Sequence, residues 1–189
     1  TGEAVKVQEE EYGRFDLRAG VLNGKPTARA FSGRRVVAEV TGDSVEEALT
    51  QVKAAIDRQE VEARAARRDG VPTAEEYVQA FERIHQRIGH HHWLMLRAHY
   101  HAPDRTMSAG GLARAAGYRS YSSANEKYGL LGKMLADELS VTPPLTYEKT
   151  KLPVWTSTLA EEGPLNDDGR MTWRMRPEVA GALERLNAV

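Results

Sequence analysis

The stretch from Met107 to Leu139 constrains the fold more than any other part of this sequence. Ser108 can cap a short helix through its side-chain oxygen, and Gly117 can end that helix in the left-handed conformation. Ser122 or Ser123 can then cap a second helix. Apolar residues recur at helical spacing in both segments, at Leu112, Ala113, Ala116, Ala124, Tyr128, Leu131 and Leu135. The pattern predicts two helices joined by a tight turn, a helix-turn-helix.

The turn and the start of the second predicted helix carry side chains of the kind that hydrogen-bond phosphates or base edges. These side chains belong to Arg119, Ser120, Tyr121, Ser122, Ser123, Asn125 and Lys127, while Arg114 and Lys133 are placed to contact phosphates. Asparagine suits adenine and arginine suits guanine where either reaches a base edge. We therefore predict that this segment binds double-stranded DNA. The alternative is a helical hairpin that only packs.

The charge is unevenly distributed along the chain. The 189 residues contain 26 Lys and Arg against 27 Asp and Glu, a formal net charge of −1, which is less basic than DNA-binding proteins usually are. Between Arg97 and Lys133, however, six bases face only two acids, which leaves a charge of +4 on that segment. A local basic patch on a neutral protein is compatible with modest non-specific affinity for DNA.

The first part of the chain predicts a small β-β-β-α unit over residues 1–57. Its first 11 residues are polar and acidic and predict a frayed end. Alternation predicts a strand over Tyr12–Leu22, and Asn23 with Gly24 is a strong two-residue hairpin signal. Two more strands are expected over Lys25–Phe31 and Arg35–Thr41, and then a helix capped by Asp43 or Ser44, with an apolar stripe that reaches Ile56.

The remainder predicts a helical connector over residues 58–72 and a winged-helix-like domain over residues 73–189. Thr73 and Glu76 form a capping box for a helix that is expected to end at Gly89. The further elements expected are a helix over Trp93–Tyr100, the helix-turn-helix, strands over Val154–Leu159 and Met171–Arg176 that pair Trp155 with Trp173, and a helix from Pro177. Three helices followed by a hairpin is the order of a winged helix.

All six histidines lie between His85 and His101, where neighbouring imidazoles are candidate ligands for a transition metal. No His-Glu-x-x-His motif occurs, and the absence of cysteine excludes disulfides, thiolate nucleophiles and cysteine-type zinc sites. The alternatives for these histidines are helix capping, packing beside Trp93 and approach to DNA phosphates. We predict no metal site and no cofactor.

Signals of catalysis are weak throughout the sequence. Gly110 and Gly111 are not followed by the Lys-Ser/Thr of a phosphate-binding loop, and there is no serine nucleophile elbow. The segment Tyr147–Lys151 carries Glu and Lys but lacks the strand and the upstream aspartate of a restriction-type nuclease core. We therefore expect that the protein is not an enzyme.

Residues 93 to 139 resemble a bacterial helix-turn-helix module. The resemblance rests on Trp93–Tyr100, Met107–Ala113, Ala116–Asn125 and Tyr128–Gly132. Similar modules occur in small stand-alone hypothetical proteins and in regions attached to HNH restriction-type endonucleases. The resemblance implies DNA recognition in bacterial or phage defence or counter-defence. Because the endonuclease part has no counterpart here, the resemblance implies no cleavage.

Together these features predict an α+β protein: a small three-stranded antiparallel sheet with one helix, joined by a helix to a winged-helix-like domain. The sequence shows neither a signal peptide nor an apolar run long enough to span a membrane, so we expect a cytoplasmic protein. Double-stranded DNA is the favoured partner. The alternatives are a protein-binding inhibitor of the anti-restriction or anti-CRISPR type, which acts on a nuclease without catalysis of its own, and a metal-dependent enzyme that uses the histidines.

Overall fold

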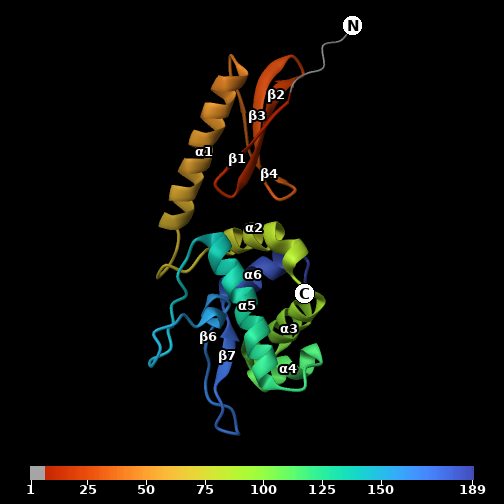
Figure 1. Cartoon of the computed structure of the whole chain (residues 1–189), viewed down its shortest axis with the longest axis vertical. Helices are drawn as coiled ribbons and strands as arrows, with labels where there is room; N and C mark the ends of the chain where they lie inside the picture. Colours follow the sequence, from red (N-terminus) through yellow and green to blue (C-terminus); the bar gives the residue numbers. More distant parts are fainter. Residues whose placement is uncertain (1–6) are drawn as a thin grey trace. The chain divides into compact units, whose positions relative to one another are not determined.

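The computed structural model describes residues 7–189 and confirms a mixed α+β protein (Figure 1). Contacts between residues divide the chain into two compact units. The N-terminal unit ends at Val71, and the C-terminal unit spans Pro72–Val189. Each unit has a hydrophobic core of its own.

The N-terminal unit is an antiparallel sheet with one long helix beside it. Its elements are β1 (Gln8–Tyr12), β2 (Phe15–Leu22), β3 (Lys25–Ser32), β4 (Arg35–Thr41) and α1 (Val45–Ala65). The strands follow one another in the order β1-β2-β3-β4, so each neighbouring pair is a hairpin. Asn23 and Gly24 both adopt positive φ in the β2–β3 turn, as their dipeptide predicts.

The prediction of three strands in this unit was wrong, because residues 7–71 form four. Residues 8–11, predicted to be frayed, form most of β1, and Gly13 makes a tight turn at positive φ where a continuous strand was expected. Acidic residues disfavour strands, but here Glu9 pairs with Arg18 at 3.3 Å and Glu10 with Lys53 at 2.6 Å. These cross-strand and helix contacts explain why β1 forms. Residues 1–6 of the predicted frayed segment lie outside the described residues.

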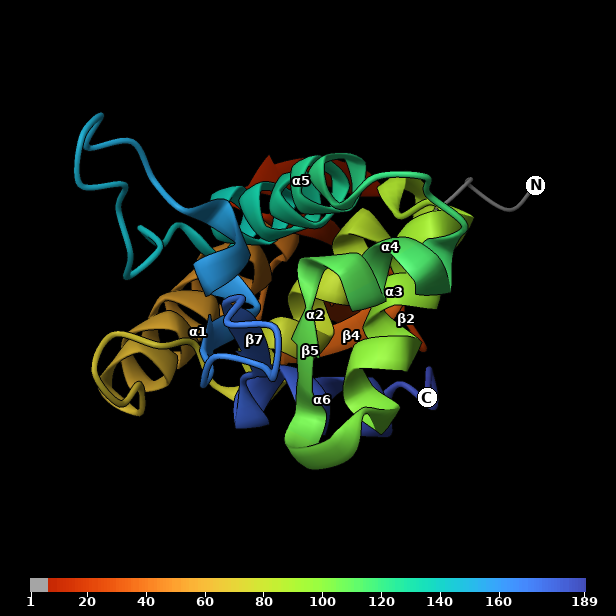
Figure 2. The same ribbon diagram turned by 90° about the horizontal axis from the view of Figure 1, so that it is seen from below.

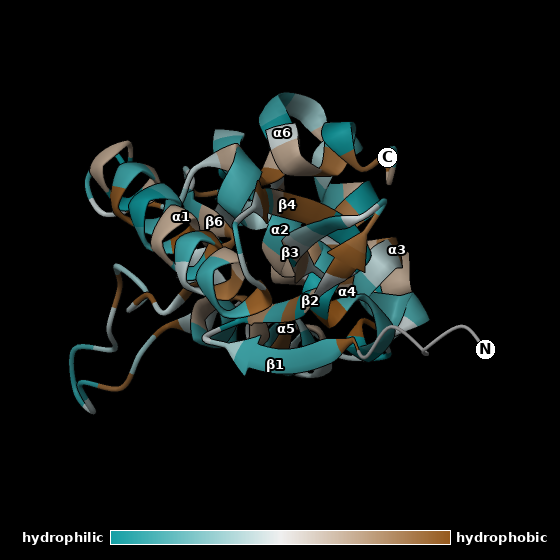
Figure 3. Cartoon of the chain, turned by 90° about the horizontal axis from the view of Figure 1, so that it is seen from above, coloured by the Kyte–Doolittle hydropathy of each residue, from teal (hydrophilic) through white to brown (hydrophobic). Residues whose placement is uncertain are grey.

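One face of this sheet packs on α1, and the other presents charged side chains. Leu17 and Ala30 of the sheet are buried against Val52 and Ile56 of α1, which Ser44 caps by accepting a hydrogen bond from the Glu47 N–H. On the opposite face Arg18 pairs with Glu9 and Arg29 pairs with Glu39. Figure 3 shows that β1, at one edge of the sheet, is largely hydrophilic.

The C-terminal unit combines five α-helices with a small sheet. Its elements are α2 (Ala74–Ile84), η1 (His85–Arg87), α3 (His90–His101), η2 (Pro103–Arg105), β5 (Thr106–Ser108), α4 (Ala109–Ala116), α5 (Tyr121–Leu139), η3 (Trp155–Thr158), β6 (Ala160–Glu162), β7 (Thr172–Met175) and α6 (Pro177–Arg185), where η marks a 3-10 helix. The core lies among the helices and includes Tyr77, Phe81, Leu96, Leu135 and Leu183. Figure 2 shows β5 leading directly into α4.

The boundary between α2 and α3 differs from the prediction. The capping box of Thr73 and Glu76 forms, but α2 ends at Ile84 rather than at Gly89. Gly89 instead precedes α3, where its N–H donates a 3.2 Å hydrogen bond to Nδ1 of His92. The three successive histidines are therefore the first turn of α3, because an imidazole nitrogen can cap a helix start as a carboxylate does.

The small sheet also differs from the expected hairpin. It has three strands in the order β5-β7-β6, and residues 155–158 form η3 instead of a strand. Trp173 lies opposite Met107 and Glu162, so the predicted pairing with Trp155 was wrong. The reason lies in α5, where Gly132 lets the backbone of η3 approach the helix so closely that a strand pairing is replaced by helix packing.

Candidate nucleic-acid interface

The candidate interface is built on α4, the turn after it and α5. Ser108 caps α4 by accepting a 3.2 Å hydrogen bond from the Gly111 N–H. Gly117 ends α4 with φ of +74°, a conformation that suits glycine. The N–H of Tyr118 then donates to the Ala113 carbonyl at 2.9 Å, which reverses the chain into α5. These features agree with the predicted helix-turn-helix.

Ser120, not Ser122 or Ser123, caps α5. Its side-chain oxygen accepts a 3.2 Å hydrogen bond from the Ser123 N–H, and the two hydroxyl oxygens lie 3.0 Å apart. The prediction placed the cap two or three residues too late, because all three serines satisfy the sequence preference equally. The hydroxyl groups of Ser120 and Ser123 are therefore engaged at the N-terminus of α5.

The outward face of the first turns of α5 is polar. Tyr121 is 60% exposed, and Ser122 and Asn125 are also exposed. None of these three side chains makes a hydrogen bond within residues 7–189. The opposite face buries Ala124 and Tyr128 in the core. The face that turns away from the core therefore carries unused donors and acceptors.

The basic side chains predicted to bind DNA fall into two groups. Arg114 and Arg119 are exposed and make no ion pair within the described part of the chain. Lys133 instead pairs with Asp137 at 2.6 Å and lies over the Trp155 ring.

Lys127 is partly buried, and its ammonium lies 3.9 Å from the Glu126 carboxylate. Partial burial lowers the pKa of His92 on α3, a hydrogen bond with the Lys127 backbone opposes this shift, and the positive charge of Lys127 adds to it. Of the four predicted cations, then, Arg114 and Arg119 are the two without a partner in the described residues.

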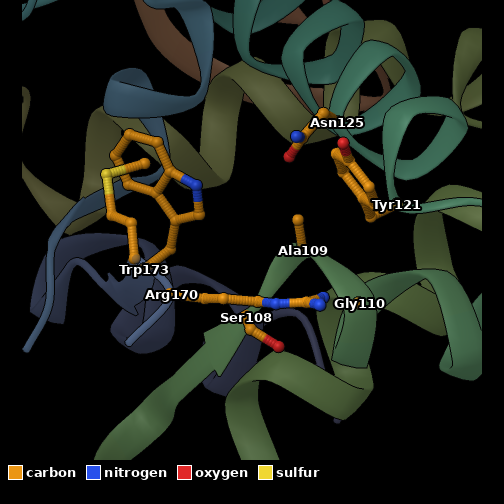
Figure 4. Close-up of a pocket in the computed structure, with 8 residues that line it drawn as sticks. Ser108, Ala109, Gly110, Tyr121, Asn125, Arg170 and Trp173 are labelled. Carbon is orange, nitrogen blue, oxygen red and sulfur yellow. The ribbon is translucent and has the colours of Figure 1, made fainter. Parts of the chain in front are cut away.

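An open pocket of about 470 Å³ lies between the starts of α4 and α5 and strand β7 (Figure 4). We call it the α5 pocket. It is lined by Ser108, Ala109 and Gly110 on one side, by Tyr121 and Asn125 on α5, and by Arg170, Met171 and Trp173 on the β6–β7 hairpin. In Figure 4 the Asn125 amide and the indole nitrogen of Trp173 both face the space between them.

A longer groove of about 1120 Å³ adjoins this pocket. It shares Asn125, Met171 and Trp173 with the α5 pocket and continues past Gly129 to Lys133. The loop around Tyr147 forms its other wall. The polar face of α5 is thus bordered by a concave surface along more than two of its turns.

Sequence reasoning missed the contribution of the β6–β7 hairpin to this surface. Arg170 and Trp173 follow Asn125 by 45 or more residues, and no local motif connects them. Arg170 is exposed and its guanidinium makes no ion pair within residues 7–189. Trp173 was recognised only as a presumed partner of Trp155. The antiparallel pairing of β5 with β7 brings these residues beside Ser108.

His99 connects the three elements beneath this surface. It is fully buried, and its two ring nitrogens lie 2.8 Å from the Tyr128 hydroxyl and 2.8 Å from the Trp173 carbonyl oxygen. A carbonyl only accepts, so Nε2 carries the proton and donates to it, while Nδ1 accepts from the Tyr128 hydroxyl. Burial lowers the pKa of His99, which keeps this neutral tautomer at neutral pH.

The other histidines also have local partners. His91 lies 2.9 Å from the Ala116 carbonyl at the end of α4, and His85 lies beside Trp93. Within residues 7–189, no group of three or more His, Asp or Glu side chains is arranged to hold a metal ion.

A search of residues 7–189 for a helix long and apolar enough to cross a membrane finds none. Comparison of the chain with protein-family models, with curated proteins and with solved structures gives no match.

Proposed function

We propose that the C-terminal unit binds duplex DNA, with α4 and α5 as a helix-turn-helix and the start of α5 at the major groove. The observation that carries this proposal is the outward face of α5. There Tyr121, Ser122 and Asn125 have no partner within residues 7–189, and the unpaired Arg114 and Arg119 precede them. Phosphate contacts position such a helix, and side chains near its N-terminus read bases.

The order of elements around this helix supports a winged-helix-like arrangement. Helix α3 is followed by β5, α4, α5, β6 and β7, and β7 lies between the other two strands. In this arrangement the β6–β7 hairpin is the wing. Arg170, whose backbone pairs with Asn166 to close the turn of this hairpin, supplies a third cation next to α5. Asp167 and Asp168 lie in the same turn and would repel phosphates, so we assign the DNA contact of the wing to Arg170 alone.

The residues take different roles in this proposal. Arg114, Arg119 and Arg170 contact phosphates or, for Arg119, guanine. Asn125 and Tyr121 approach the bases. Lys127 and Lys133 contribute less than their positions in the sequence suggest, because the first is paired with Glu126 and the second with Asp137. The target in this proposal is duplex DNA. The setting is the bacterial or phage defence or counter-defence that the resemblance of residues 93 to 139 implies.

Replacing Arg114 and Arg119 together with alanine should weaken binding to a short random duplex about tenfold or more at low salt, measured by fluorescence anisotropy. The slope of log Kd against log salt should decrease by about 2, because each phosphate contact contributes about 0.9. The matched control is the double variant Arg174→Ala with Arg185→Ala. It removes the same charge from two exposed arginines that are paired with Asp104 and Glu75.

Two results would contradict the proposal. One is a wild-type protein that fails to bind duplex at micromolar concentration, which would favour the protein-binding inhibitor. The other is an equal loss of affinity in the test and control variants, since that would mean that the net charge of the protein, and not the position of Arg114 and Arg119, determines the affinity.

A further inference from the structure

We propose that the α5 pocket holds a single unpaired nucleobase of the bound DNA. This inference rests on the proposed DNA binding and adds a ligand class that the helix-turn-helix alone does not require. Trp173 is 5% exposed, and its indole nitrogen faces the pocket (Figure 4). The indole N–H makes no hydrogen bond within residues 7–189. The ring is thus held by the protein while its N–H donor opens into the pocket, an arrangement that suits a ligand that accepts there.

The other polar groups of the pocket are also unused. The Asn125 amide, which offers one donor group (its NH2) and one acceptor (its carbonyl oxygen), has no partner among the described residues. Neighbouring donor and acceptor atoms occur together on the edges of adenine and cytosine, and an asparagine side chain can satisfy both at once. With the Trp173 N–H, the pocket presents two donors and one acceptor to a flat, heteroatom-rich ring.

The shape and the remaining walls suit the same ligand. Tyr121 is 60% exposed and supplies an aromatic face, and Ala109 and Gly110 leave the α4 side of the pocket without bulk. Bases that leave a stack are held between aromatic or apolar side chains and read by hydrogen bonds to their edges. A volume of about 470 Å³ is ample for one base and its sugar.

The charge around the pocket suits the backbone that carries such a base. Arg170 lines the pocket without an ion pair, and its side chain runs toward the α4 side in Figure 4. On α4, Nη1 of Arg114 lies 3.6 Å from the point where a Cβ on Gly110 would stand. Two free guanidinium groups thus flank the α4 side, where phosphates on either side of an extruded nucleotide would be expected.

The test compares three duplexes of the same sequence: fully paired, with one extra adenine as a bulge, and with an abasic site in place of that adenine. A paired base costs a few kcal/mol to unstack, and the bulged base is already unpaired. Wild-type protein should therefore bind the bulged duplex about tenfold more tightly than the other two. Single-stranded DNA of the same sequence distinguishes the source of the base. Binding as tight as that of the bulged duplex indicates a strand end or gap, and weaker binding indicates a base from within a duplex.

A pocket-filling variant tests the location without changing any charge. Ala109→Phe places a ring into the space that the Ala109 methyl group faces in Figure 4, and it should abolish the preference for the bulge while binding to paired duplex persists. The matched control is Ala115→Phe on the same helix, at a position that does not line the pocket. Asn125→Ala should reduce the preference as well.

The outcomes separate this inference from the proposed function. If paired, bulged and abasic duplexes bind equally, or if the abasic duplex binds as tightly as the bulged one, the pocket takes no base although DNA binding stands. If Ala109→Phe keeps the full preference, the base lies elsewhere and the inference is overturned. If the wild-type protein binds none of the three duplexes, the proposed function fails and this inference fails with it.

Discussion

His99 is one residue that connects three elements of the C-terminal unit. Through its two ring nitrogens it connects α3, on which it lies, with Tyr128 of α5 and the backbone of β7. The neutral imidazole satisfies both groups, because Nε2 donates to the carbonyl and Nδ1 accepts from the hydroxyl, whereas an imidazolium would leave the Tyr128 hydroxyl proton without this acceptor. The position of β7 against the helices is therefore coupled to the protonation state of one side chain.

The free energy of unfolding should fall as the pH is lowered from about 6.5, because burial lowers the pKa of His99 in the folded chain. Between the unfolded and the folded pKa the unfolded chain binds a proton that the folded chain does not. The stability is therefore complete above that window and decreases by up to about 1.4 kcal/mol per pH unit within it. Urea titrations at several pH values measure this change.

The control for this prediction is His99→Gln, whose amide nitrogen can still donate to the Trp173 carbonyl but does not titrate in this range. Its stability should depend less steeply on pH than that of the wild type. The other five histidines are common to both proteins, so parallel curves would refute the assignment to His99.

Among the elements, α5 has the most demanding contact, because η3 lies directly against it. A Cβ added at Gly132 would overlap the carbonyl oxygen of Trp155, which is backbone and has little freedom to move. At Gly129, one turn earlier, an added Cβ would meet Thr156 and Trp155 atoms at ordinary contact distances of 3.7 and 4.0 Å. Two glycines of the same helix therefore differ in what they allow.

Gly132→Ala should destabilise the C-terminal unit by about 2–3 kcal/mol, because the overlap forces η3 away and outweighs the higher helix propensity of alanine. Gly129→Ala should instead be neutral or stabilise by up to about 1 kcal/mol. Urea unfolding of both variants measures the difference. Equal effects would show that the close approach to η3 contributes nothing.

The caps and turns that were predicted correctly from the sequence are those with local signals. Ser108, Gly117, Asn23 and Gly24 specify caps and turns within a few residues of chain, and all four do so in the structure. Strand β1 and helix η3 were missed because long-range contacts decide them. The acids of β1 are paired by Arg18 and Lys53, and η3 depends on the space at Gly132.

At the scale of the whole molecule, residues 7–189 form two separate cores. Ile56 belongs to the core of the N-terminal unit, and Leu135 belongs to the core of the C-terminal unit. All three tryptophans, Trp93, Trp155 and Trp173, lie in the C-terminal unit, so their fluorescence reports on that unit alone.

Ile56→Ala should lower the stability of the N-terminal unit by about 2–5 kcal/mol. The tryptophan-detected urea transition should stay in place, while the transition detected by circular dichroism becomes broader or splits. Leu135→Ala should shift the tryptophan transition itself. A single transition that moves equally in both variants would mean that the two units unfold together.

Only part of the candidate site could be predicted from the sequence, because only some of its residues lie close together along the chain. Arg114, Arg119, Tyr121 and Asn125 lie on one continuous stretch, and their surface position follows from the helical period. Arg170 and Trp173 come from a hairpin whose place beside α5 is set by the pairing of β7 with β5. The partners of Lys127 and Lys133, by contrast, are local in sequence, because Glu126 is the adjacent residue and Asp137 lies one helical turn later.

The pairing of β5 with β7 also sets the time at which the site appears during synthesis. Thr106 pairs with Arg174, so a ribosome must translate most of the C-terminal unit before the small sheet can close. The N-terminal sheet, by contrast, consists of hairpins between neighbours and can form as soon as its own residues have emerged. A nascent chain that ends before β7 would thus present α4 and α5 without the α5 pocket, and the proposed capacity to hold a base would arise only after β7 has emerged.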